Sequence, residues 1–148
     1  MNLKNFFLIF FSLIVIYLNY IRLESFILQP KLLYDLANDE VSFEFNQINN
    51  KIKNYPSLAI NTIPLNSLIS RYAIDSKKFD DAIRLLEQGN KLNPYLAFSN
   101  YQLSRIYTQL NDYDKAYKYI ENAYKQSPNI IAISALHNAL SDLINLED

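Results

Sequence analysis

The chain opens with a long apolar segment. No charged residue stands between Asn5 and Ile21, and these roughly 17 residues would extend over about 26 Å as a helix, close to the thickness of a bilayer's hydrocarbon core. Because the segment is apolar on every side, it suits lipid better than the core of a small domain. We expect a transmembrane anchor at residues 1–28, with membrane contact through residues 5–28 and the helix ended by Pro30.

Two interpretations of this segment compete, a cleaved secretory signal and a retained anchor. Cleavage needs small residues after the apolar run, and residues 18–29 offer only Ser25, which favours a retained single-pass anchor. The charges near its ends, Lys4 before and Arg22 with Glu24 after, give little bias in orientation. A short N-terminus before a long chain resembles a signal anchor, so we expect the soluble part outside the cytoplasm, on the periplasmic side.

A 34-residue period decides the rest of the organisation. Shifting the chain by this period superimposes residues 63–96 on residues 97–130. The identical pairs are Asn66/Asn100, Ser70/Ser104, Arg71/Arg105, Asp80/Asp114, Ala82/Ala116, Glu87/Glu121, Lys91/Lys125 and Pro94/Pro128. Each copy predicts two helices, at about 65–75 and 78–92 in the first and about 95–109 and 112–126 in the second.

The second helix of each copy carries a recognisable motif. It begins aromatic-x-x-Ala, continues to a small residue and closes on a proline. The residues concerned are Phe79, Ala82, Gly89 and Pro94 in copy one and Tyr113, Ala116, Ala123 and Pro128 in copy two. This unit resembles the tetratricopeptide repeat, although the Trp, Gly and Tyr of that family's first helix are mostly absent. The resemblance implies an all-α stack of helical hairpins.

The resemblance also implies a way of binding. In that family the first helices of successive units line a concave groove that holds a protein or peptide segment. The matching positions are Ser67, Arg71, Ile74, Phe98, Tyr101, Arg105 and Thr108. Arg71 and Arg105 are equivalent, so the pair either binds a carboxylate or phosphate in the groove or is solvated and salt-bridged.

The flanks of the repeats also show helical patterns. In the neck, residues 29–62, we expect two short helices, the second capped by Asn38 or Asp39, and consider a degenerate extra repeat. At the other end, residues 131–148 predict a capping helix with Ile133 and Leu140 on its apolar side. We see no domain-scale linker, so we expect the soluble part to be one body.

Composition then removes several classes of chemistry. The chain has no cysteine, one histidine and one glycine, which excludes disulfides, cysteine chemistry, His-based metal sites and glycine-rich phosphate loops. With a net charge of -1 nothing suggests a nucleic acid. We therefore expect no metal, no cofactor and no catalysis, and interpret His137 and the dense tyrosines as packing residues.

The only glycine fits the repeat. Gly89 stands where copy two has Ala123, so a small residue is needed there for close helix packing. We expect Gly89→Leu to overpack the site and Gly89→Ala to be tolerated.

The predicted function is a non-catalytic, membrane-anchored interaction module or scaffold in the cell envelope. An alternative comes from two segments, residues 82–89 and residues 93–99. Together with the preceding span and neck, they resemble the C-terminal tails of O-antigen ligase or polysaccharide-polymerase proteins. That resemblance implies an accessory component of surface-polysaccharide assembly.

Overall fold

The computed structural model of the chain describes residues 2–59 and 61–145. The chain divides into two compact units, residues 1–56 and residues 57–148, and each is described by itself. The described residues are helical apart from connections and one isolated bridge between Leu58 and Pro64. The expected all-α fold is therefore confirmed, whereas the division into two units differs from the single soluble body that we expected.

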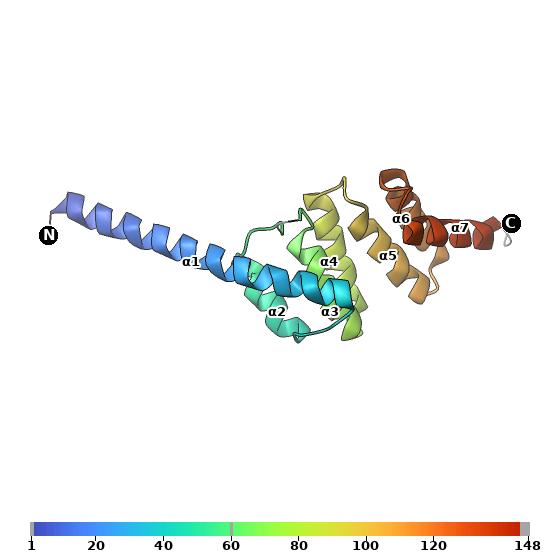
Figure 1. Cartoon of the computed structure of the whole chain (residues 1–148), viewed down its shortest axis with the longest axis horizontal. Helices are drawn as coiled ribbons and strands as arrows, with labels where there is room; N and C mark the ends of the chain where they lie inside the picture. The colour runs from blue at the N-terminus through green and yellow to red at the C-terminus, as the bar shows by residue number, and fades with distance from the viewer. Residues whose placement is uncertain (1, 60, 146–148) are drawn as a thin grey trace. The chain divides into compact units, whose positions relative to one another are not determined.

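The first unit begins with one long helix, α1 (Leu3–Asn38), drawn in blue to cyan in Figure 1. Our expectation that Pro30 ends this helix is wrong, because Pro30 lies inside it. A proline removes one intrahelical hydrogen bond and displaces the carbonyl one turn earlier. Both Pro30 and Phe26, the residue that carries this carbonyl, are exposed, so the proline ring does not have to fit into a packed core.

The end of α1 is fixed by Asp35 and Asp39. Asp39 adopts a left-handed conformation with φ 55°, and its N–H donates to the carbonyl of Asp35. The carboxylate of Asp35 accepts from the backbone N–H of Ser42 at 2.9 Å and from its hydroxyl at 2.8 Å. Asp39 therefore closes α1, and the expectation that it caps a following helix is wrong.

The neck differs from the two helices that we expected. Its first expected helix is the end of α1, and only α2 (Phe45–Lys51) follows, preceded by Glu44 and continued by η1 (Ile52–Asn54). Residues up to Pro56 group with α1, and the rest of the neck groups with the repeats. A degenerate repeat in this region stays a prediction.

The second unit holds the repeated hairpins. Its helices are α3 (Leu65–Asp75), α4 (Phe79–Leu92), α5 (Ala97–Gln109), α6 (Tyr113–Gln126) and α7 (Ile131–Asn145). From α3 to α6, each boundary lies within about two residues of the predicted one. Consecutive helices pack on one another from α3 to α7, as Figure 1 shows from green to red. Among them α3–α4 and α5–α6 form the two hairpins of the repeat.

The two hairpins turn in the same way. Lys77 and Asn111, one period apart, are both left-handed, with φ 57° and φ 58°. The next residue donates its N–H across the turn in each copy, Lys78 to the carbonyl of Ala73 at 2.8 Å and Asp112 to that of Tyr107 at 2.9 Å. These bonds satisfy carbonyls at the helix ends. The 34-residue period is thus a period of backbone conformation as well as of sequence.

Small residues lie where the helices approach closely. Ala82, Ala116 and Ala123 are fully buried, and Gly89 is buried too. A Cβ added to Gly89 would lie 1.8 Å from Oγ of Ser67. The need for a small residue is thus supported. Because the Ser67 side chain already fills the space beside this glycine, we now expect Gly89→Ala to destabilise the unit rather than to be tolerated.

Helix α7 covers the end of the stack. Ile133 and Leu140 of α7 are buried in a cluster with Ala116, Ile120 and Ala123 of α6. The exposed side of α7 is mostly polar or small, as at Ala135 and Asn138, although Ile131 is also 84% exposed there. A mainly polar outer face is what the end of a repeat stack requires. Of the predicted capping helix, residues 146–148 lie outside the described residues.

Candidate functional site

The predicted groove positions of α5 form one side of that helix. Phe98, Tyr101 and Thr108 are half-buried, and Arg105 is exposed. The spacing of three and four residues places them on one face. The guanidinium carbon of Arg105 lies 5.8 Å from the centre of the Tyr101 ring, and its Nη1 donates to Oε1 of Gln102 at 3.4 Å. This face thus presents a cation held beside an aromatic ring.

The equivalent positions of α3 have different surroundings. Arg71 and Ile74 are half-buried, and Ser67 is only 1% exposed. The Ser67 hydroxyl lies 2.8 Å from Oγ of Ser99 on α5, within hydrogen-bond distance. Ser67 therefore packs between helices, and its assignment to the groove is wrong. Arg71 and Arg105 also differ in exposure, so the two arginines do not form a symmetric pair.

Helix α7 carries a third set of equivalent positions that the sequence analysis missed. The 34-residue shift takes Phe98, Tyr101, Arg105 and Thr108 to Ala132, Ala135, Ala139 and Asp142. All four are exposed. The same 34-residue period that relates α3 to α5 relates α5 to α7, but α7 was interpreted only as a cap. At the predicted groove positions, α7 therefore carries small side chains where α5 carries mostly large ones.

A shallow depression lies on α4, α6 and the connection to α5. It has a volume of ≈ 500 Å³ and is lined by Glu87, Asn90, Lys91, Pro94 and Tyr119. The Tyr119 hydroxyl donates to Oε1 of Glu87 at 3.4 Å. Burial and the nearby Glu87 carboxylate raise the pKa of Tyr119. The hydrogen bond to Glu87 therefore holds the tyrosine in place as a structural part of this surface.

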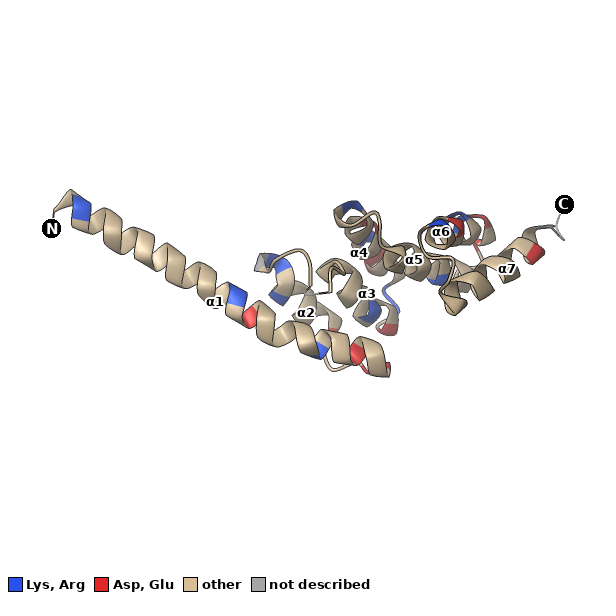
Figure 2. Cartoon of the chain, turned by 45° about the horizontal axis from the view of Figure 1, so that its top comes forward, with Lys and Arg blue, Asp and Glu red and all other residues tan. Residues whose placement is uncertain are grey.

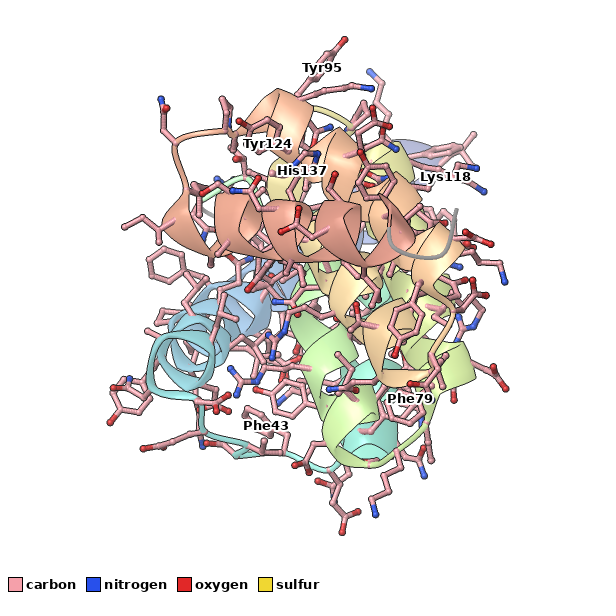
Figure 3. All side chains as sticks on the ribbon, turned by 90° about the vertical axis from the view of Figure 1, so that its right-hand side faces the viewer. Phe43, Phe79, Tyr95, Lys118, Tyr124 and His137 are labelled. Carbon is pink, nitrogen blue, oxygen red and sulfur yellow. The ribbon has the colours of Figure 1, made fainter. Side chains whose placement is uncertain are left out.

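The aromatic residues of copy two pack as we expected. The ring of His137 stacks on Tyr124 at 4.4 Å between centres and lies 5.6 Å from Tyr117, and Figure 3 shows Tyr124 and His137 side by side. Tyr107, Tyr113 and Tyr117 contact the core that α7 shares with the second hairpin. His137 is thus confirmed as a packing residue. Within residues 2–59 and 61–145, no group of three or more His, Asp or Glu side chains could hold a metal ion.

The apolar part of α1 is the other candidate surface. Its most apolar 18-residue window has a mean hydropathy of 2.1, and none of that window is buried. Figure 2 shows the long uncharged stretch of this helix in tan, between the positions coloured for charge near the N-terminus and further along. By length and composition α1 can cross a membrane.

Comparison with known families supports the interpretation of the repeat. Residues 99–130 match the family model described as tetratricopeptide repeat. The match covers most of α5, all of α6 and the closing Pro128. It therefore falls on the second copy of the repeat. No curated protein matches the chain. The fold is therefore all-α and like that of tetratricopeptide repeat proteins, whereas the resemblance to O-antigen ligase tails has no support from these comparisons.

Proposed function

We propose that the chain is a membrane-tethered interaction module. In this proposal α1 anchors the chain, and the exposed sides of α5 and α7 bind a segment of a partner protein. The observation that carries it is the presence in one chain of an exposed apolar helix of membrane-spanning length and a tetratricopeptide repeat, whose general role is protein binding. The tethered repeats would hold a partner at the membrane without chemistry of their own.

The groove chemistry suggests what kind of segment binds. Arg105 offers an exposed guanidinium, which pairs well with a carboxylate. Tyr101 beside it offers an aromatic surface, and the alanines of α7 leave room for bulky partner side chains. Arg71 and Ile74 of α3 are half-buried and contribute at most part of their surface. We propose an extended segment that carries an acidic residue next to an apolar one.

The groove is tested by single substitutions in the full chain. We expect Arg105→Ala and Tyr101→Ala each to weaken partner binding about tenfold or more, because buried arginine and tyrosine contacts often dominate an interface. The measurement is partner recovery after affinity capture from solubilised membranes. Arg84→Ala is the matched control, since Arg84 is exposed on α4 and pairs with Asp81 of its own helix. Equal recovery with all three variants would contradict the groove.

Anchoring is tested separately. We expect the full chain to sediment with membranes and to resist extraction at alkaline pH, and a chain lacking residues 2–21 to be released. Protease added after the outer membrane is made permeable should reach the repeats if they lie on the periplasmic side; protection until the inner membrane is opened would place them inside. Release of the full chain by alkaline extraction would contradict a spanning helix.

A role beside a surface-polysaccharide enzyme is the alternative to a free-standing scaffold. A neighbouring gene for a multi-span membrane protein that lacks its own helical tail would favour it. Its absence would favour the scaffold.

A further inference from the structure

The polar residues of the apolar segment follow a strict spacing. Asn5, Ser12 and Asn19 are seven residues apart, which places them on one side of α1. All three are exposed. Apart from Tyr17, every other residue from position 5 to position 19 is apolar. The polar groups of this segment are therefore gathered into a single line along the helix.

The side chains around this line are aliphatic. Between Asn5 and Ser12, the line is flanked by Leu8 and Ile9. Between Ser12 and Asn19, it is flanked by Val15 and Ile16. At about 100° per residue, the bulkier rings fall elsewhere. Phe6, Phe7, Phe10 and Tyr17 lie on the opposite side of the helix, and Phe11 and Tyr20 lie at its flanks. The line of Asn5, Ser12 and Asn19 with its four aliphatic neighbours, here called the seam, is thus a narrow strip without aromatic rings.

Beyond the apolar segment, the same side of α1 continues as an exposed apolar strip. Leu23, Phe26, Ile27 and Tyr34 lie on or beside the same line, and each is more than half exposed. The buried residues of this part of α1, among them Ser25, Leu28 and Leu32, lie on the other side of the helix. One face of α1 therefore stays uncovered over most of its length, with apolar side chains outside the segment as well as within it.

We propose that two copies of this chain pair in parallel along the seam. The inference rests on the proposed membrane anchoring, because it places the polar groups in lipid, where side-chain hydrogen bonds between helices favour association. Both copies enter the membrane in the same direction, so a two-fold pair brings each polar residue opposite its own copy at the same depth.

Asparagine suits this arrangement because its amide both donates and accepts. One amide N–H of Asn19 donates to the carbonyl of Val15 at 2.8 Å. A carboxamide has a second N–H and an acceptor oxygen, which can bond to the same groups of the second copy. A seven-residue repeat is also the period that keeps two helices in contact over many turns. The hydrogen bonds and the spacing therefore point to the same occupant, a second α1.

Because the chain has no cysteine, single cysteines can report the pairing in the full chain. We expect Val15→Cys, within the seam, to form a disulfide-linked dimer in oxidised membranes. Tyr17→Cys is the control at nearly the same depth on the opposite side, and it should form several-fold less. Adding Asn19→Leu to Val15→Cys should lower the dimer about fivefold or more, since such bonds contribute about 1–2 kcal/mol in peptides. Adding Phe10→Leu instead should leave it unchanged.

Alkaline extraction of the same membranes separates the two proposals. If the variants are released, anchoring fails, and the pairing fails with it. If they stay in the membrane but Val15→Cys and Tyr17→Cys cross-link equally, or neither cross-links, anchoring stands and the seam is wrong. If Asn19→Leu leaves the amount of disulfide-linked dimer unchanged, hydrogen bonds of the polar line do not stabilise the pair, and that part of the proposal is wrong. A cross-linked product whose mass is not twice that of the chain would show that this face of α1 contacts another protein instead.

Discussion

Replacing Ile133 by alanine is expected to lower the free energy of unfolding of the repeat unit by about 2–5 kcal/mol. Ile133 is 3% exposed and lies in the cluster that α7 forms with the second hairpin. Truncation removes its apolar surface from that cluster and leaves a cavity between α7 and α6. Thermal or urea unfolding followed by circular dichroism measures the change.

Ile131 provides a matched control two residues earlier in the same helix. It is 84% exposed, so Ile131→Ala deletes the same atoms with almost no buried surface to lose. We expect a change within about 0.5 kcal/mol. If the two variants melt together, α7 does not dock as a cap, and the groove positions that we assign to it lose their support.

The sequence was informative wherever a physical requirement recurs with the period. Close helix packing needs small residues, which is why Ala82 and Ala116 marked the same place in both copies. Helix starts and ends left their own signals, as with Asp80 in a first turn and Lys91 in a last turn. These requirements are local, and so the five helices of the repeat unit could be placed to within a few residues.

The structure of the neck was harder to predict, because the point at which α1 ends depends on competition between local signals. Pro30 favours a helix end, but its neighbours are strong helix formers and its ring is exposed, so α1 continues. The actual end depends on the carboxylate of Asp35, whose partner Ser42 is seven residues away. Hydrogen bonds of this kind leave no periodic signal in a single sequence.

The predicted groove positions show the same limit. They follow from the family resemblance, and all four of those on α5 are at least partly exposed. Which side chain stays exposed at a position depends on the neighbouring helix: Ser67 is buried against Ser99, whereas its equivalent Tyr101 keeps part of its ring exposed. The period carries over the backbone position but not the size of the side chain, and size decides burial.

Replacing Gly89 by alanine is expected to destabilise the repeat unit by about 1–3 kcal/mol, the usual range for overpacking. The new Cβ would lie 1.8 Å from Oγ and 3.1 Å from Cβ of Ser67, and 3.3 Å from Cβ of Pro64. Rotation of the Ser67 hydroxyl relieves the first contact only by breaking its buried hydrogen bond to Ser99. The better helix propensity of alanine, about 1 kcal/mol, offsets only part of this.

A double-mutant cycle with Ser67→Ala assigns the cost to this contact. Without the Ser67 oxygen the closest contact disappears, so Gly89→Ala should cost less in the Ser67→Ala background than in the natural chain. Ala123→Gly is the reverse exchange at the equivalent position of copy two, where a Cβ is already accommodated, and it should destabilise by about 1 kcal/mol. If Gly89→Ala instead raises the melting temperature, Ser67 and Pro64 give way more easily than their contacts indicate, and the close approach of α3 and α4 is looser than described. A destabilised Gly89→Ala leaves the repeat register intact, because the register rests on the shared turns at Lys77 and Asn111.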